Sequence, residues 1–264
     1  MENEKGKKEV LKLDSIALTY QSLKGETPAI NDVSLTVYEG EIVSIVGPSG
    51  CGKTTLLSII AGLIKPSNGS VRIDNEPVTT KETIKNRVGY MFQKDHLFEW
   101  RTVWENVILA FEINKTKTKE NLERVERLLK KYGLYDFKDK HPRELSGGMR
   151  QRVALIRTLA TNPSVLLLDE PFSALDYQTR IKVCDDVYNI IKNENKTAVL
   201  VTHDIAESIC LANKVVVLTK RPSVIKSTHL IELKEKTFLK RRSETNFQIL
   251  FDKVWEELQD EGEK

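Results

Sequence analysis

With 264 residues, the chain is long enough for one large domain or two small ones with a sizeable hydrophobic core. Hydrophobic residues make up 40% and charged residues 30% of it, a balance typical of soluble globular proteins. The net charge of +3, from 41 basic and 38 acidic residues, argues neither for nor against nucleic-acid binding, and no apolar run reaches the roughly 18 residues that a membrane-spanning helix needs.

The cysteines and the N-terminal sequence bear on the compartment. Cys51, Cys184 and Cys210 are odd in number and show no paired spacing, which favours free thiols in a reducing environment. The sequence MENEKGKKEV is charged and lacks the apolar segment of a secretory signal. We therefore expect a cytosolic protein.

The first half of the chain predicts strands, a loop and helices. Strands are expected within residues 10–46; the last of them, EIVSIV, runs into a glycine-rich loop, and TTLLSIIAGL is expected as the following helix. Two short strands, SVRID and RVGYMF, come next. Between residues 102 and 132 the apolar residues take helical spacing, in VWENVILAFEI and LERVERLLKKY.

The second half alternates between strands and helices. VLLLDEP is short and continuously apolar, as expected of a parallel strand covered on both faces. A helix is expected over about 177–192, followed by the strands AVLVTH and KVVVLT. From about residue 232 the chain is helical and charged, with an apolar stripe expected to pack on its own chain. The KRR run at 240–242 indicates a solvated group of charges.

This order predicts an α/β fold. The predicted core covers residues 1–93 and 162–231 and includes an antiparallel β portion. An inserted helical subdomain, residues 94–161, interrupts the core, and residues 232–264 form a C-terminal helical extension.

A phosphate-binding loop follows the strand EIVSIV. GPSGCGKT fits the pattern G-x-x-x-x-G-K-[ST] between a strand and a helix. Its glycines let backbone N–H groups approach phosphates, Lys53 reaches the β and γ phosphates, and the Thr54 hydroxyl can ligate Mg²⁺. The motif predicts a P-loop NTPase core of the RecA-like kind, with a nucleotide held by Gly47, Pro48, Ser49, Gly50, Cys51, Gly52, Lys53, Thr54 and Thr55.

Two adjacent carboxylates end the strand VLLLD. Ligands of open α/β sheets bind at the carboxyl ends of the strands, so Asp169 is the expected Mg²⁺ partner. Glu170, one residue on, is placed to polarise an attacking water. The guanine-reading pattern N-K-x-D is absent, and Tyr20, on a strand before the loop, is a candidate to stack on an adenine base.

A second anion site is predicted at LSGGMRQR, residues 145–152. Ser146, Gly147 and Gly148 are small residues at the start of a helix, where backbone N–H groups are open to an anion. The sequence thus carries two phosphate cradles about a hundred residues apart, but the pattern lysine Lys53 belongs only to the first.

Taken together, these motifs closely resemble the ATP-binding cassette (ABC) ATPases, in order along residues 10 to about 220. Tyr20 matches the aromatic A-loop position, Gln93 in YMFQ the Q-loop, and LSGGM the signature. Val165 to Asp169 match the Walker B strand and Glu170 the catalytic glutamate, while SALD, ending at Asp176, matches the D-loop and His203 in VTHD the switch histidine.

The resemblance implies how the two cradles cooperate. In this family two cassettes face each other head to tail, so that Ser146 to Gly148 of one chain would meet the γ-phosphate held by Lys53 of the other. It implies ATP and Mg²⁺ as ligands, with Lys53, Gln93, Glu170 and His203 in catalysis. Thr54, Gln93 and Asp169 would serve the metal, and Asp176 would lie at the shared nucleotide.

A narrower likeness points to the nitrate, sulfonate and taurine group of bacterial importers, through FQKDHLFEWRTVWENV, PFSALDYQTR, TKRPSVI and RRSETNFQIL. It implies a homodimer on the cytoplasmic face of the membrane, bound to two permease subunits and fed by an external solute-binding protein. Docking is expected near Leu97, Phe98 and Trp100, because apolar residues on a loop can form an exposed patch. No nucleic-acid partner is expected.

Alternatives remain open from sequence. They are the ATPase of an export system and a non-transport ABC ATPase, such as a chromosome or repair protein, a translation factor or a regulator without hydrolysis. Against these, Lys53 and Ser146 are too close in sequence for a long coiled-coil insertion, only one cassette is present, and Glu170 and His203 are intact.

Overall fold

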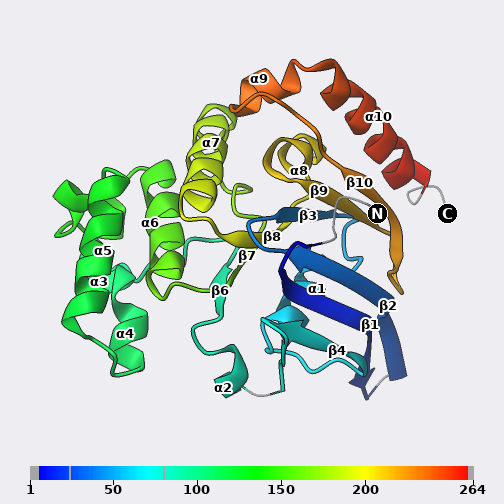
Figure 1. Cartoon of the computed structure of the whole chain (residues 1–264), viewed down its shortest axis with the longest axis horizontal. Helices are drawn as coiled ribbons and strands as arrows, with labels where there is room; N and C mark the ends of the chain where they lie inside the picture. Colours follow the sequence, from blue (N-terminus) through cyan, green and yellow to red (C-terminus); the bar gives the residue numbers. More distant parts are fainter. Residues whose placement is uncertain (1–5, 24, 80, 261–264) are drawn as a thin grey trace.

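The computed structural model describes residues 6–23, 25–79 and 81–260, and two sheets organise them (Figure 1). The strands are β1 (Glu9–Ser22), β2 (Gly25–Tyr38), β3 (Ile42–Val46), β4 (Asn68–Ile73), β5 (Glu76–Pro77), β6 (Val88–Met91), β7 (Val165–Asp169), β8 (Thr197–Val201), β9 (Lys214–Leu218) and β10 (Ile225–Leu230). The helices are α1 (Lys53–Ile60), α2 (Lys81–Ile84), α3 (Val103–Val107), α4 (Leu109–Ile113), α5 (Lys119–Lys131), α6 (Gly147–Ala160), α7 (Tyr177–Asn193), α8 (Ile205–Leu211), α9 (Phe238–Arg242) and α10 (Thr245–Asp260).

The central sheet has the order β10-β9-β3-β8-β7-β6. Strands β9, β3, β8, β7 and β6 are parallel, and β10 joins the edge antiparallel to β9. Successive residues of β3 face two different cores, Ile42 and Val46 one side and Val43 and Ile45 the other. Burial on both faces explains why such strands are continuously apolar.

The antiparallel sheet β2-β1-β4-β5 covers one side of the central sheet, with α1 between them. Helices α6, α7, α8 and α10 contribute to the core on the other side. Helices α3 to α6 form a lobe at the left of Figure 1, between β6 and β7 in the chain. The side chain of Thr102 caps α3, and that of Thr118 caps α5, which packs on α6 through Val125, Leu128 and Leu129.

The predicted strands and helices occur in the predicted order, but β5, α2, α8 and β10 were not predicted, and one prediction about the C-terminal charges is wrong. The strand β10 was not predicted, because IKSTHL mixes polar and apolar residues at a half-exposed edge. In the KRR run, Arg241 is buried rather than solvated, because its guanidinium donates to backbone oxygens of Cys210 and Glu235 and to the Tyr188 hydroxyl.

The C-terminal stripe packs on its own chain as expected: α10 rests on α8 and β9 and buries Phe247 and Val254. The division into a core at 1–93 and 162–231, an inserted subdomain at 94–161 and an extension at 232–264 stays a prediction. Residues 1–5 and 261–264 of that division lie outside the described part of the chain.

Candidate nucleotide site

The phosphate-binding loop joins β3 to α1. Gly50 and Gly52 have φ of 74° and 111°, a left-handed backbone that suits glycine. Gly52 stands at the N-cap without a side chain, so the first-turn N–H groups of α1 are left open to an anion. The Lys53 ammonium donates to the carbonyl oxygens of Gly47 at 2.8 Å and Pro48 at 3.0 Å. The loop thus holds its one lysine against its own backbone.

Cys51 packs beneath this loop. It is buried, and its sulfur lies 3.9 Å from the Lys53 ammonium. Burial raises the pKa of the Cys51 thiol above its usual value, although the nearby ammonium opposes the rise. The thiol is therefore kept neutral, as a packing residue of the loop.

Thr54, in the first turn of α1, contacts Asp169, the last residue of β7. The Thr54 hydroxyl donates to one Asp169 carboxylate oxygen at 3.1 Å, and the Tyr90 hydroxyl donates to the other at 3.2 Å. Burial raises the pKa of Asp169 above its ordinary value, and the two hydrogen bonds oppose that rise. Tyr90 was not predicted from sequence; its place at the end of β6, beside β7, was the available signal.

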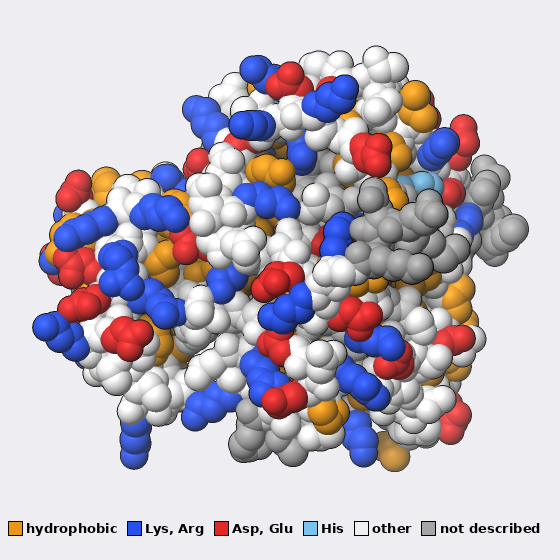
Figure 2. Space-filling model, in the orientation of Figure 1, with side chains coloured by type: hydrophobic (Ala, Val, Ile, Leu, Met, Phe, Trp, Pro, Cys, Tyr) orange, Lys and Arg blue, Asp and Glu red, His pale blue; other side chains and the backbone are white. Residues whose placement is uncertain are grey.

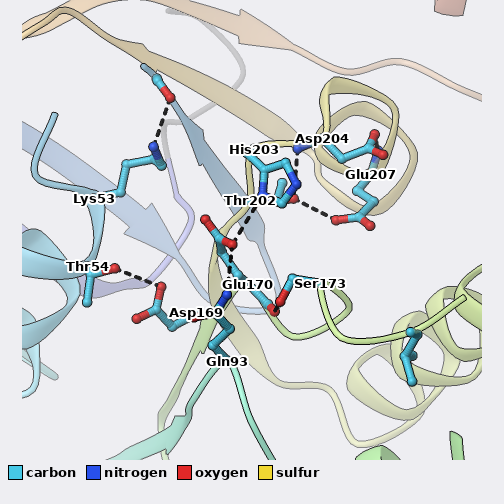
Figure 3. Close-up of polar contacts among 12 residues, drawn as sticks. Lys53, Thr54, Gln93, Asp169, Glu170, Ser173, Thr202, His203, Asp204 and Glu207 are labelled. Carbon is cyan, nitrogen blue, oxygen red and sulfur yellow. Dashed lines mark hydrogen bonds and ion pairs between the residues drawn. The ribbon is translucent and has the colours of Figure 1, made fainter. Parts of the chain in front are cut away.

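Glu170 is the centre of a second polar group (Figure 3). Its φ of 45° lies in the left-handed region, which residues other than glycine seldom adopt, and its N–H donates to Val201 O at 2.8 Å. One oxygen of its carboxylate lies 3.1 Å from His203 Nδ1 and 3.4 Å from the Gln93 amide nitrogen. Two residues that are far apart in sequence, Gln93 and His203, are thus brought to the Glu170 carboxylate.

A largely buried hydrogen-bond network fixes the loop that carries His203. The Thr202 hydroxyl donates to Glu207 Oε2 at 2.6 Å and accepts from the Asp204 N–H at 3.1 Å. The Glu207 carboxylate is also 3.8 Å from the guanidinium of Arg180, which donates to Leu175 O at 3.1 Å. The network therefore links the loop after β8 to the loop that carries SALD.

A cavity of about 500 Å³ opens over these groups. Its walls are Ser49, Gly50, Gly52, Lys53, Thr54, Thr55, Glu170, His203 and Arg221. Arg221 was not predicted as a site residue; its guanidinium lies beside Gly50, and its position after the strand KVVVLT, within TKRPSVI, was the available signal. Tyr20 stands nearby on β1, partly exposed, with its hydroxyl 3.1 Å from Thr55 Oγ1.

The signature residues are placed apart from this cavity. Ser146 caps α6 by accepting from the Met149 N–H at 3.2 Å, and Asp176 caps α7 by accepting from the Thr179 N–H at 3.0 Å. Gly147 packs closely on Leu175, the leucine of the SALD pattern. Neither Ser146, Gly147, Gly148 nor Asp176 lines the cavity over Lys53 in a single chain.

The expected docking loop needs one correction. Leu97 is only 7% exposed and belongs to the hydrophobic core, so the prediction that it forms part of an exposed patch is wrong. Phe98 is half-buried and lies against Trp100, with ring centroids 4.8 Å apart, while Trp100 is 74% exposed. The buried Asn106 side chain fixes this loop, accepting from the Phe98 N–H and donating to Phe98 O.

The comparisons with known proteins agree with this geometry. The family described as ABC transporter matches residues 30–173. The ABC transporter ATP-binding protein YtlC of Bacillus subtilis is 47% identical over 250 residues, which cover 94% of this chain and 95% of that protein. The taurine import ATP-binding protein TauB of Jannaschia sp. is 43% identical over 201 residues, covering 76% and 74% respectively.

Solved structures share the fold. A dimeric ATP-binding cassette bound to ADP and Pi is 34% identical, with a TM-score of 0.71 over 84% of this chain and 99% of that one. The cbiO1 subunit of Clostridium perfringens is 28% identical, with a TM-score of 0.74 over 84% and 89%. The predicted P-loop NTPase fold is therefore confirmed, and the chain belongs to the ABC transporter family as an ATP-hydrolysing, ATP-binding subunit similar to those of taurine importers.

Proposed function

We propose that this chain powers the uptake of a small solute, of the nitrate, sulfonate and taurine type, as the ATPase of an importer. The observation that carries the catalytic part is the contact of the Glu170 carboxylate with His203 and Gln93 beside the phosphate loop. In the proposal Glu170 accepts a proton from the attacking water, and His203 holds this carboxylate and the γ-phosphate in place.

Lys53 and the loop provide the binding part. The ammonium leaves the carbonyls of Gly47 and Pro48 for the β and γ phosphates, while the open N–H groups of α1 receive phosphate oxygens. The Tyr20 ring, partly exposed near Thr55, supports an adenine. Arg221 adds a positive charge at the wall of the same cavity.

The donor set fits Mg²⁺. A hydroxyl and a carboxylate, on Thr54 and Asp169, stand 3.1 Å apart, and magnesium prefers such hard oxygen ligands, few of them from protein. Gln93 would contribute its amide oxygen. When bound, the ion supplies positive charge that offsets the charge of the β and γ phosphates.

The chain is proposed to act as a head-to-tail homodimer. Ser146, Gly147, Gly148 and Asp176 do not line the cavity of their own chain, although the helix start at Ser146 suits an anion. A second copy that turns these residues toward Lys53 would complete both nucleotide sites with the same contacts repeated. The related cassette solved with ADP and Pi is dimeric, which supports this arrangement.

The membrane partners are proposed to be two permease subunits, with a solute-binding protein outside. Among the described residues, no helix combines the length and apolar character needed to cross a bilayer. Transport then requires separate membrane subunits, which would hold this chain at the cytoplasmic face. The relatives named as taurine import proteins support import over export.

The docking surface is proposed to include Phe98 and Trp100 and the hollow beside them. This hollow, of about 610 Å³, lies between the segment before β6 and helix α4, and exposes Ile113. Arg157 lines it and donates to the backbone oxygens of Asp95 and His96, so the hollow and the loop adjoin. A permease segment could fill the hollow while the two aromatic rings contact its flank.

The substitution Glu170→Gln tests this proposal. The variant keeps the shape of the site but loses the base, so we expect Mg-ATP binding with hydrolysis slowed about 10²- to 10⁴-fold. The trapped ATP should hold two chains together, which light scattering would detect. Glu256→Gln, on the exposed side of α10, is the matched control and should hydrolyse ATP normally. Hydrolysis by Glu170→Gln at the parental rate would contradict the assignment.

A further inference from the structure

A cavity of about 350 Å³ lies far from the nucleotide along the sheet. Its walls include Arg124, Arg127 and Lys131 of α5, Lys196 at the start of β8, and one acidic residue, Glu194. The residues of the candidate nucleotide site follow the carboxyl ends of β7 and β8, whereas Lys196 precedes the amino end of β8. The cavity therefore lies between the helical lobe and the amino ends of the strands, at the end of the sheet away from the nucleotide site.

The charges around this cavity are not balanced. Lys131 and Glu194 pair at 2.6 Å, and the Tyr132 hydroxyl also donates to Glu194, so this carboxylate is taken. Within the described residues, neither Arg124 nor Arg127 has a carboxylate within ion-pair distance. The Lys196 ammonium donates to two neutral oxygens, Asn162 Oδ1 at 2.7 Å and Pro163 O at 3.0 Å. The two arginines are thus left without an ion pair in the described part of the chain, and the charge of Lys196 is offset only by Glu194, which Lys131 already pairs.

This imbalance has an electrostatic cost. Burial lowers the pKa of Lys196 below its ordinary value, and the positive charge of Arg124 lowers it further, while the Glu194 carboxylate opposes the fall. Over the face in Figure 2, basic and acidic side chains are interspersed. A cavity bordered by like charges from two parts of the chain is arranged as an anion would require.

We propose that this cavity binds the phosphate group of a small ligand. Two arginine forks match phosphate oxygens bidentately, and Lys196 adds a third donor through its remaining N–H. The volume lies at the lower end of small-molecule sites, which suits pyrophosphate or a small phosphomonoester.

A ligand held there would connect two parts of the molecule. Arg124 and Arg127 belong to α5 of the helical lobe, and Lys196 immediately precedes β8 of the central sheet. A phosphate group between them ties the lobe to the sheet, so occupancy would oppose any rotation of one against the other. Such a ligand would control the ATPase from outside the nucleotide cavity.

Pyrophosphate is the probe, and the full chain carrying Lys53→Ala is the background, because that change weakens the competing phosphate loop by removing its lysine. Calorimetry at about 0.15 M salt, where diffuse attraction is screened, should show saturable binding. Adding Arg124→Gln and Arg127→Gln should weaken the binding at least about tenfold, as expected for losing charge-assisted bonds. The matched control is Lys119→Gln with Lys130→Gln, which changes the charge equally on the same helix at exposed positions.

A second readout needs no change in the cavity. Pyrophosphate should protect Lys196 from amine-modifying reagents, measured by mass spectrometry, while the modification of Lys119 stays unchanged. The proposal is overturned if the parental background shows no saturable binding, if both double variants lose it equally, or if Lys196 is not protected.

The same variants distinguish the source of the phosphate. Flotation with vesicles containing phosphatidic acid, abolished by pyrophosphate and by Arg124→Gln with Arg127→Gln, would assign a lipid headgroup. Pyrophosphate binding without flotation would assign a soluble phosphorylated compound. Either result supports the site, and neither depends on the proposed transport function.

Discussion

Lys53 illustrates how one residue can organise the loop and serve the substrate. The residue is only 8% exposed, and its ammonium donates to two carbonyl oxygens of its own loop. Around it, Arg221 and the open N–H groups of α1 are the other donors for phosphate at this cavity. The lysine is nevertheless the one cation of the loop whose side chain can move to contact the β and γ phosphates.

We expect Lys53→Ala to abolish ATP hydrolysis, because the charge on the β and γ phosphates is no longer neutralised from the loop. Phosphate release by the purified chain measures this. Lys192→Ala is a suitable control, since Lys192 is also partly buried and donates to a backbone oxygen, Gly40 O at 2.9 Å, but lies outside the cavity. Phosphate release by Lys53→Ala at the parental rate would refute the role of residues 47–55.

At this scale the sequence predicted the residues whose spacing forms a motif. The pattern around Lys53 and the pair Asp169 and Glu170 needed only local order, and the structure places them around one cavity or beside it. Arg221 and Tyr90 were missed, because their contacts depend on which strands lie side by side. Leu97 was predicted wrongly, since a short apolar loop segment does not show which side chain turns inward.

Among the elements, α8 sets the position of the loop that carries His203. Its Glu207 is 3% exposed, and the carboxylate accepts a hydrogen bond from the Thr202 hydroxyl. The Arg180 guanidinium lies 3.8 Å from the same carboxylate. Asp204 and His203 are the other charged or titratable groups that affect it. Arg180 also donates to Leu175 O. A change at Glu207 therefore affects both the His203 loop and the loop that carries SALD.

Burial raises the pKa of Glu207 from 4.5 to about 7. Between these values the folded chain keeps a proton that the unfolded chain releases, so this group contributes stability below about pH 4.5 and loses that contribution as the pH rises to about 7. Glu207→Gln should remove this slope. Relative to the parental chain, the variant should gain roughly 3 kcal/mol in free energy of unfolding across this interval, at about 1.4 kcal/mol per pH unit.

Urea unfolding at several pH values between about 4.5 and 7 measures this difference. Glu256→Gln, exposed on α10, controls for the loss of a carboxylate and should keep the parental slope. A constant difference between Glu207→Gln and the parental chain at all these values would show that Glu207 titrates normally.

Element prediction succeeded where periodicity was strong. The buried strands β3, β7 and β8 and the helix α7 follow from continuous apolar runs and helical spacing. The edge strand β10 did not, because its pairing with β9 rather than its own pattern makes it a strand. The burial of Arg241 likewise depends on acceptors at Cys210 and Tyr188, which are distant in sequence.

At the scale of the whole molecule, the nucleotide cavity and the docking surface must communicate. Gln93 contacts Glu170 at the cavity, and the chain reaches Trp100 only seven residues later. Between them, Arg150 and Arg157 of α6 bind Asp95 and the backbone of His96. The same helix is capped by the signature Ser146, so α6 connects the proposed dimer surface with the proposed docking loop.

Trp100 is the most exposed aromatic of this loop, at 74%, and a large exposed ring on a loop that adjoins a hollow is a suitable interface anchor. We expect Trp100→Ala to weaken permease binding by about 2–4 kcal/mol, the usual loss at such anchors, and to leave ATP binding by the isolated chain unchanged. Co-purification from detergent-solubilised membranes and transport in vesicles measure the loss.

Trp255→Ala is the control: it removes another exposed tryptophan, 49% exposed on α10, and should leave permease binding and ATP binding intact. Equal losses in the two variants, or loss of ATP binding in Trp100→Ala, would show that this loop is not the docking site. Because Phe98 is half-buried against Trp100, Phe98→Ala should also lower the stability of the free chain, which separates a packing residue from a contact residue within one loop.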